Sequence, residues 1–426
     1  MSAQPFATLA EWLAHLERLH PKSIALGLER VAAVRRALQL TPDFPVITVG
    51  GTNGKGSTCA YLEAMLTHGG YRTGCYTSPH LVRYNERVRI GQREAGDAEL
   101  CEAFARIEAV RGDVPLTYFE FGTLAAMQLF ARAGVGVAVL EVGLGGRLDA
   151  VNAFDADCAV VTSVALDHMD YLGTTREQIG FEKAGIFRAG RPAVCADPDP
   201  PRTLLDEAER IGARLLRIGA DFGYSADRQQ WRYRGPGGGR HGLPLPVLRG
   251  EHQFANASAA IAALDELKAR VPVGAQDIRN GLVSVELSGR FQVLPGRPLT
   301  VLDVAHNPHA AHALARMLAG MGRARTFAVF AMLRDKDIAG VVDAVRPCID
   351  RWLVADIHDA RGASAAQLCE LLERAGVAPA AVEAFATPAA AYRHACDRAV
   401  ETDRIVVFGS FHTVADVLRE RGHRGT

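Results

Sequence analysis

The stretch Val46-Ile47-Thr48-Val49-Gly50-Gly51-Thr52-Asn53-Gly54-Lys55-Gly56-Ser57 decides the fold, because an apolar run leads straight into a glycine-rich loop. Glycines there can adopt positive φ and direct several backbone N–H groups at one anion. Lys55 supplies charge to outer phosphates, and Ser57 or Thr58 can place a hydroxyl on Mg²⁺. A helix expected from Ser57 to His68 directs its positive end at the same phosphates. The segment predicts a strand, a phosphate loop and a helix.

The loop departs twice from the usual phosphate-loop pattern. Val49 stands where the first glycine is expected, and Gly56 follows Lys55 where serine or threonine is usual. The alternative is a tight strand-to-helix turn without a ligand. The preceding strand, the following helix and the lysine favour the phosphate loop.

Composition narrows the class of protein. The chain has 426 residues, of which 48% are hydrophobic, and its 48 basic residues balance its 48 acidic ones. The chain lacks the excess of basic residues that would indicate nucleic-acid binding. No run reaches the ~18 apolar residues of a membrane span. The eight cysteines form no CxxC pair, which is typical of a reducing cytosol. Residues 1–21 predict an amphipathic helix rather than a signal peptide. We expect a cytoplasmic protein.

The first part of the chain alternates strands with helices. Strands are expected at 45–49, 73–77, 135–142 and 158–164, and helices at 99–110, 123–133, 176–184 and 256–268. Near-continuous apolar strands separated by helices predict a parallel sheet covered on both faces. Residues 197–250 are polar and rich in proline and glycine, so we expect an excursion that includes a hairpin.

A second alternation follows Pro295-Gly296-Arg297-Pro298. Strands are expected at 299–304, 326–332, 351–356 and 404–409, and helices at 310–318, 338–346, 365–375 and 387–399. The fold class is therefore α/β, with a phosphate-loop domain at 1–294, a linker at 295–298 and a smaller Rossmann-like domain at 299–426. A cleft between two domains is a common place for a ligand.

Polar residues at the carboxyl ends of the predicted parallel strands are the candidate site, because ligands gather there. They are Ser78, Glu141 and His168. Glu141 can hold Mg²⁺ directly or through water, although it could instead cap or pair with Arg147. His168 could be an ordinary loop histidine, and Ser78 before a proline could be turn chemistry alone.

For three more segments, the residue types alone do not decide between a functional and a purely structural role. Lys183 has the pattern of a solvated helix lysine. Arg290 could reach a phosphate by a forked hydrogen bond, or could be a surface arginine. Asp303-Val304-Ala305-His306-Asn307-Pro308-His309 ends the first strand of the second domain, where so many polar groups are rarely only a turn.

Taken together, these segments resemble the bifunctional dihydrofolate synthase/folylpolyglutamate synthase family of Mur-ligase-like ATP-dependent amide ligases. The resemblance covers almost the whole chain. Its main motifs are GTNGKGST at 51–58, TSPHLVRYNERVRI at 77–90, LTYFEFGTLAA at 116–126, LEVGLGGRLDAVN at 140–152, VTSVALDHMDYLG at 161–173, EKAGIFR at 182–188, GRFQV at 289–293, DVAHNPHA at 303–310 and GSFHTVADV at 409–417.

The resemblance implies roles for individual residues. It implies ATP contacts from Gly51, Thr52, Asn53, Gly54, Lys55, Gly56, Ser57, Asn256, Arg290 and Asp303. It implies Mg²⁺ positions at Ser57, Ser78, Glu141 and His168, and catalytic roles for Lys55, Lys183 and His306, with Lys183 carbamylated. It places the pterin at Thr117, Tyr118, Phe119, Glu120, Leu148, Asp149 and Ala150, where Phe119 could stack on the ring.

The implied activity joins L-glutamate to dihydropteroate and adds γ-linked glutamates to tetrahydrofolates through an acyl phosphate. ATP and Mg²⁺ are the implied cofactors, with room for a monovalent cation such as K⁺, and the partners are small molecules bound by a monomer. Closure of the two domains would exclude water from the acyl phosphate. Alternatives are folylpolyglutamate synthesis alone, a Mur-type cell-wall ligase, or a phosphate-loop ATPase switch.

Overall fold

The computed structural model describes residues 6–20, 22 and 24–424. These divide into two compact units, each described here by itself. The first comprises the described residues up to His80, with Tyr84–Val247 and Gln253–Val285. The second comprises Leu81–Arg83, Leu248–His252 and the described residues from Glu286 onward.

The first unit is built on a mixed sheet whose strand order is β4-β3-β2-β5-β1-β6-β7-β8. Strands β2, β5, β1, β6, β7 and β8 run parallel, while β3 and β4 form an antiparallel edge. The strands are β1 (Val46–Gly50), β2 (Thr73–Tyr76), β3 (Val88–Ile90), β4 (Arg93–Glu94), β5 (Val137–Glu141), β6 (Cys158–Val161), β7 (Pro192–Cys195) and β8 (Arg214–Arg217). Strands β1, β2, β5, β6 and β7 are buried along their whole length, as expected of a covered parallel sheet.

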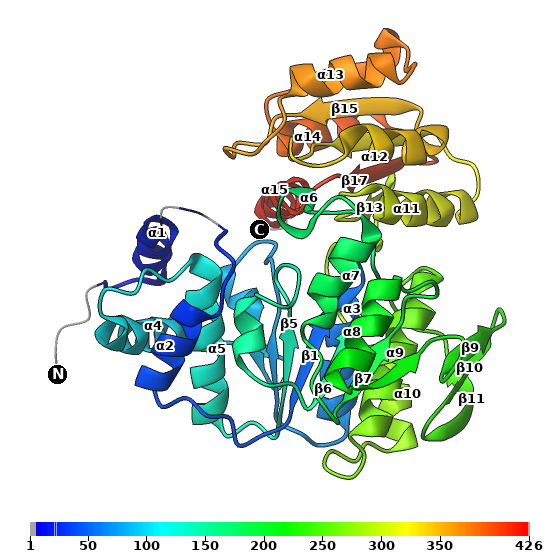
Figure 1. Cartoon of the computed structure of the whole chain (residues 1–426). Helices are drawn as coiled ribbons and strands as arrows, with labels where there is room; N and C mark the ends of the chain where they lie inside the picture. The colour runs from blue at the N-terminus through cyan, green and yellow to red at the C-terminus, as the bar shows by residue number, and fades with distance from the viewer. Residues whose placement is uncertain (1–5, 21, 23, 425–426) are drawn as a thin grey trace. The chain divides into compact units, whose positions relative to one another are not determined.

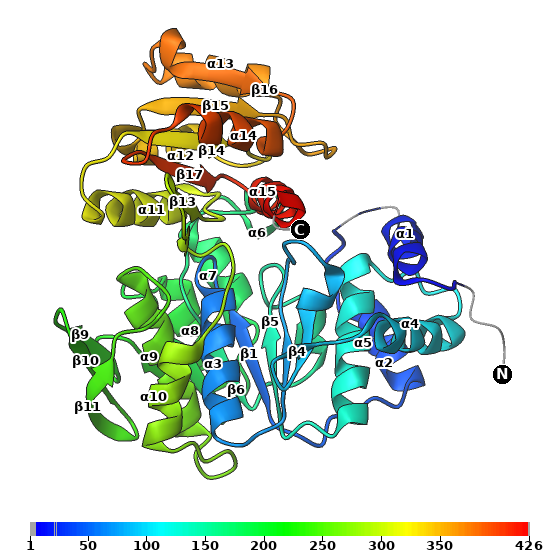
Figure 2. The same ribbon diagram turned by 180° about the vertical axis from the view of Figure 1, so that it is seen from behind.

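The helices of the first unit include those that cover this sheet (Figure 1). They are α1 (Leu9–Leu19), α2 (Glu29–Ala37), α3 (Lys55–His68), α4 (Asp97–Arg111), α5 (Tyr118–Ala133), α6 (Met169–Leu172), α7 (Arg176–Ala184), α8 (Arg202–Ile211), α9 (His252–Glu266) and α10 (Ala275–Ser284). Helix α3 packs on β1, β2 and β5, and α10 lies beside it in both views (Figures 1 and 2). Of the predicted N-terminal helix, residues 1–5 and 21 lie outside the described residues.

The excursion at 197–250 contains helix α8, strand β8 of the main sheet and a separate antiparallel sheet of order β11-β10-β9. These strands are β9 (Gly223–Ala226), β10 (Gln230–Gly235) and β11 (Gly238–Pro244). Trp231 and Tyr233 alternate with exposed residues along β10 and are buried. The predicted hairpin is therefore β10–β11, with one apolar face.

The second unit contains a sheet of order β12-β13-β17-β14-β15-β16 in which only the β12–β13 pair is antiparallel among the described strands. The strands are β12 (Gln292–Leu294), β13 (Leu299–Leu302), β14 (Thr326–Phe330), β15 (Arg351–Ala355), β16 (Val382–Phe385) and β17 (Arg404–Phe408). The helices are α11 (Pro308–Gly320), α12 (Ile338–Val345), α13 (Ala365–Arg374), α14 (Pro388–Arg398) and α15 (Phe411–Arg424).

The α/β class of both units is confirmed, but residues 295–298 differ from the expected linker. They form the turn of the β12–β13 hairpin, inside the second unit. Proline and glycine mark tight turns as readily as linkers, which explains the difference. No described helix has the length and apolar character needed to cross a membrane.

Candidate functional site

The central strands of the first sheet bring the predicted strand-end residues together. In the β1–β5 pair Val49 lies opposite Glu141, and in the β1–β6 pair Gly50 lies opposite Val161. Strand β2 pairs with the other side of β5, so Tyr76 lies opposite Leu140. The phosphate loop, Glu141 and the segments after β2 and β6 therefore leave one edge of the sheet.

The loop after β1 has the backbone shape that its glycines predict. Gly51 has φ +141° and Gly54, the N-cap of α3, has φ +90°. A Cβ on Gly51 would lie 1.9 Å from Thr162 Oγ1, so no side chain fits there. Lys55 Nζ donates to the carbonyls of Gly51 (3.1 Å) and Thr52 (3.2 Å). The lysine therefore lies folded over its own loop, next to the N-terminus of a long helix.

The segment after β6 braces this loop. Thr162 Oγ1 donates to the Asn53 carbonyl (2.6 Å), and Ser163 Oγ accepts from the Asn53 N–H (3.0 Å). Thr52 N–H donates to the Ser163 carbonyl (2.8 Å). Our sequence prediction omitted Thr162 and Ser163. The strand-end rule could have found them, because both directly follow β6.

Helix α9 contacts the loop through Asn256, for which the family resemblance implies an ATP contact. A Cβ on Gly54 would lie 2.5 Å from Asn256 Oδ1. Asn256 Nδ2 donates to Gln253 Oε1 (3.1 Å), and Gln253 Nε2 donates to Ser57 Oγ (3.3 Å). All three side chains are buried. Gln253 was missed, and nothing local in the sequence indicates its link to Ser57.

The Glu141 carboxylate is buried at the end of β5, with 4% of the residue exposed. Its Oε2 accepts from the Ser78 N–H at 3.0 Å. Glu141 and Ser78 are thus brought together beside the loop. His168, with φ +52°, is the N-cap of α6, and its ring lies 4.0 Å from the Asp167 carboxylate.

These residues fit a magnesium ion held partly by phosphates. Among the described residues, no three His, Cys, Asp or Glu side chains form a metal-binding group. Mg²⁺ commonly takes only one or two carboxylates, together with substrate phosphates and water. One buried carboxylate beside a phosphate loop is the donor set expected for that kind of site.

Lys183, at the end of α7, is buried rather than solvated, with 3% of the residue exposed. Burial lowers the pKa of its ammonium from 10.5 to about 7, and the positive charge of Lys55 adds to the decrease. Asp167 and Asp149 act in the opposite direction. Lys183 therefore faces the same charged region as the phosphate-loop lysine, which corrects its reading as a solvated helix residue.

The start of α5 carries the aromatic residues predicted for the pterin. Thr117 is the N-cap, and its Oγ1 accepts from the Glu120 N–H (3.2 Å). The Glu120 carboxylate in turn accepts from the Thr117 N–H (2.7 Å) and forms an ion pair with Arg30 (2.9 Å). Thr117 and Glu120 therefore fix the helix start, while Tyr118 and Phe119 remain half-buried.

The second predicted pterin segment, 148–150, follows the glycine turns after β5. Asp149 is buried and accepts from the N–H groups of Leu144 (2.9 Å) and Val151 (3.1 Å). Burial raises the pKa of its carboxyl to about 7. The Leu148 carbonyl accepts from the Gly27 N–H (3.2 Å), and Ala150 starts a short 3₁₀ helix. The segment is held by backbone contacts on both sides.

The predicted residues of the second unit also form one group. Arg290 lies over the Phe411 ring at 5.1 Å, and the His306 ring lies 6.1 Å from the same ring. Asp303 accepts from the N–H groups of Phe291 and Ala305, both at 2.8 Å. Burial raises the pKa of the Asp303 carboxyl, while the charge of Arg290 opposes the change. Phe411 was missed by the sequence prediction.

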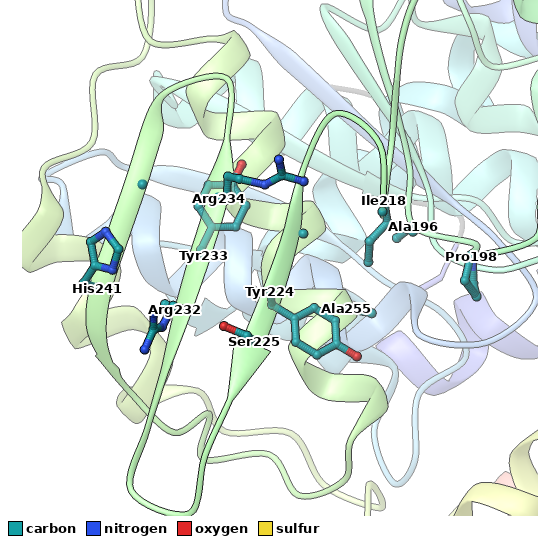
Figure 3. A pocket seen from close by; sticks show the side chains of 13 residues that line it. Ala196, Pro198, Ile218, Tyr224, Ser225, Arg232, Tyr233, Arg234, His241 and Ala255 are labelled. Atoms are coloured by element: carbon teal, nitrogen blue, oxygen red, sulfur yellow. The ribbon is translucent and has the colours of Figure 1, made fainter.

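A separate hollow of about 800 Å³ lies at the small sheet of the first unit. Figure 3 shows Tyr224 pointing toward Ala255 and Pro198, with Arg232, Arg234 and His241 on the strands. None of its lining residues is a predicted site residue, although Ala255 adjoins Asn256. This hollow is distinct from the loop, Glu141 and Lys183.

Comparison with known proteins identifies the family and the fold. The Mur ligase middle domain matches residues 49–264, and the Mur ligase glutamate ligase domain matches residues 289–411. Dihydrofolate synthase/folylpolyglutamate synthase of Escherichia coli strain K12 is 47% identical over 97% of this chain and 96% of its own.

Two solved structures have the same fold over nearly the whole chain. One is E. coli FolC in complex with DHPP and ADP, with a TM-score of 0.94, 45% identity and full coverage of both chains. The other is the bifunctional folylpolyglutamate synthase/dihydrofolate synthase of Yersinia pestis complexed with AMPPNP and a Mn ion. Its TM-score is 0.91 at 46% identity, with 99% of this chain and 100% of that chain covered. The chain belongs to the bifunctional dihydrofolate synthase/folylpolyglutamate synthase family of Mur ligases.

Proposed function

We propose that this chain is an ATP-dependent ligase that joins L-glutamate to dihydropteroate and adds γ-linked glutamates to tetrahydrofolates. The observation that carries the proposal is the single sheet edge that gathers the phosphate loop, Glu141 and the region of Lys183. The aromatic start of α5 belongs to the same unit and offers rings for a pterin. Both matching domain models belong to Mur ligases, the second being a glutamate ligase domain.

The reaction requires activation of a carboxylate, because a carboxylate oxygen is a poor leaving group. The substrate carboxylate attacks the γ-phosphorus of ATP, the bond to the β–γ bridging oxygen breaks, and ADP leaves. Glutamate's amine then attacks the acyl phosphate carbonyl and loses a proton, and the tetrahedral intermediate expels inorganic phosphate. The protein contributes mainly positioning and neutralisation of charge.

Lys55 and the loop amides neutralise the phosphate charge in this scheme. Lys55 exchanges its bonds to the Gly51 and Thr52 carbonyls for phosphate oxygens. Mg²⁺ supplies further charge neutralisation when bound. Ser57, Ser78, Glu141 and His168 are the residues that would hold it, and the Ser78 N–H keeps the Glu141 carboxylate oriented.

Lys183 is proposed to act as a carbamate. A buried ammonium beside Lys55 is doubly unfavourable, through desolvation and through repulsion between like charges. A pKa of about 7 leaves a substantial fraction of neutral amine, which can attack CO₂ and release a proton. The resulting anion replaces repulsion of Lys55 with attraction. This charge reversal gives Lys183 a role in ordering the catalytic lysine.

The other assignments are likewise proposals. Asn256, held against Gly54, is proposed to contact ATP, as are Arg290 and Asp303. His306 is proposed to act near the phosphates or glutamate. Phe119 and Tyr118, with the 148–150 segment, are proposed to bind the pterin. We also propose that the chain acts as a cytoplasmic monomer on small molecules.

The dependence of ADP release on substrates tests the proposal. Purified chain with ATP and Mg²⁺ should release ADP only when both glutamate and dihydropteroate are present. Release that is independent of glutamate would favour an ATPase switch and contradict the ligase. Substituting UDP-linked cell-wall precursors for dihydropteroate is the matched control and should give no release.

A further inference from the structure

A glycine occupies the interior of α5, at Gly122. Glycine destabilises a helix interior relative to alanine, so a packing reason is expected. A Cβ on Gly122 would lie 2.6 Å from Tyr84 Oη and 2.9 Å from Tyr76 Oη. Both separations are well below van der Waals contact. The two phenol groups therefore occupy the space that a side chain at position 122 would need.

Both phenols are fixed in this space. Tyr76 and Tyr84 are buried, and within the described residues the Tyr84 hydroxyl has no hydrogen-bond partner. Burial raises the pKa of both, that of Tyr84 to about 12, so both remain neutral. The Tyr84 ring is held edge-to-face by Phe104 and Tyr118, at 5.8 and 5.6 Å. It cannot swing outward to admit a methyl group without moving Tyr118.

The same two tyrosines support the first rings of α5. The Tyr76 ring lies 5.6 Å from the Phe119 ring, at 32° between the ring planes. Phe119 also lies against the backbone of Gly143, where a Cβ would be 2.8 Å from Phe119 Cζ. Any displacement of Tyr76 is therefore passed to Phe119, which has backbone close to its ring and little room to adjust.

We propose that Gly122 is a positioning residue for the pterin acid: by admitting the two phenols, it sets the rings of Tyr118 and Phe119 at the angle the substrate requires. The inference rests on the proposed function, in which these rings bind the pterin. Gly122 would then influence pterin binding from about one helical turn further along α5, without contacting the substrate itself.

Gly122→Ala tests the proposal, because it should change KM for dihydropteroate but not KM for ATP. The variant should raise KM for dihydropteroate about tenfold or more, since small displacements of binding groups have large effects. KM for ATP should stay within about twofold, because the phosphate loop is not touched. Gly320→Ala in α11 is the matched control, since a Cβ there meets nothing within 4 Å. It should leave both constants unchanged.

Rescue distinguishes positioning from general destabilisation. Tyr76→Phe and Tyr84→Phe together remove both oxygens that the new methyl group would meet, so Gly122→Ala/Tyr76→Phe/Tyr84→Phe should return the KM for dihydropteroate most of the way to the wild-type value. Tyr84→Phe alone should behave as wild type. Should Gly122→Ala be insoluble, Tyr76→Leu removes the support of Phe119 from the other side and should show the same separation of constants.

An unchanged KM for dihydropteroate in soluble Gly122→Ala, or equal changes in both constants, would overturn the proposal. So would a raised KM in Tyr84→Phe alone, which would place the phenol on the substrate. Failure of the proposed function is seen separately, as wild-type chain that shows no ADP release dependent on dihydropteroate. That result would overturn both proposals.

Discussion

The Ser78 N–H donates a 3.0 Å hydrogen bond to Glu141 Oε2, joining the ends of β2 and β5 beside the phosphate loop. This bond fixes the orientation of the buried carboxylate beside the loop. Its geometry makes the proposed magnesium site testable with a single conservative substitution.

Glu141→Gln keeps an oxygen that can accept from Ser78 but removes the negative charge. We expect the variant to fold normally and to require about tenfold or more Mg²⁺ for half-maximal activity, because a neutral amide is a weaker magnesium ligand. Titration of activity against Mg²⁺ at saturating ATP measures this. Wild-type magnesium dependence in the variant would remove Glu141 from the metal site.

Lys55→Ala should remove most activity while leaving the fold intact. Lys55 Nζ donates to two backbone carbonyls of its own loop, those of Gly51 and Thr52. We expect a fall in kcat of about 100-fold or more, typical for loss of an electrostatic group at a reacting centre. Lys268→Ala, an exposed lysine, is the control. Near-normal turnover by Lys55→Ala would contradict the phosphate-loop assignment.

Gly51→Ala should abolish ATP binding, since φ is +141° and the new Cβ would lie 1.9 Å from Thr162 Oγ1. Gly190→Ala is the matched control. Gly190 also has positive φ, but a Cβ there meets nothing within 4 Å, so only backbone strain of about 1 kcal/mol is added. Calorimetric titration with ATP compares the two. Equal affinities in both variants would show that the loop shape is not required.

The unmodified amine of Lys183 predicts a pH dependence of stability. Its pKa is about 7 when folded and near its ordinary 10.5 when unfolded. Between these values the unfolded chain holds the extra proton, so the free energy of unfolding rises with pH, at up to about 1.4 kcal/mol per pH unit. The destabilisation is complete below the folded pKa and disappears above 10.5.

Urea unfolding near pH 7 and near pH 9 in CO₂-free buffer measures this slope. Lys183→Met should lose it, since methionine fills similar space without a charge. Bicarbonate should also reduce the slope in wild type by forming the carbamate, whose mass is visible in the intact folded chain. Identical slopes in wild type and Lys183→Met would show that this lysine is not the group responsible.

Local patterns predicted most of the fold. Helix α7 has the predicted bounds 176–184, and the buried strands β1 and β5 lie where β-branched runs occur. Shorter elements were missed. Strand β16 is Val-Glu-Ala-Phe and β7 has only four residues, so neither gives a clear alternation.

For the site, too, local patterns revealed some residues and could not reveal others. Glu141 and Ser78 could be predicted because parallel strand order alone places their ends together. The Gln253–Ser57 bond joins residues 196 positions apart, so no local pattern records it. Burial of Lys183 was also hidden, because α7 mixes charged and apolar residues on a short helix. Only the family resemblance singled out that lysine.

The most direct test of the central claim is product identification by mass spectrometry. Purified chain with ATP, Mg²⁺ and L-glutamate is offered dihydropteroate in one reaction and tetrahydrofolate in another. We predict dihydrofolate in the first and tetrahydrofolate extended by γ-linked glutamate in the second, each with one ADP per bond. Extension of only one acid would contradict the bifunctional assignment, and extension of neither would contradict the ligase itself.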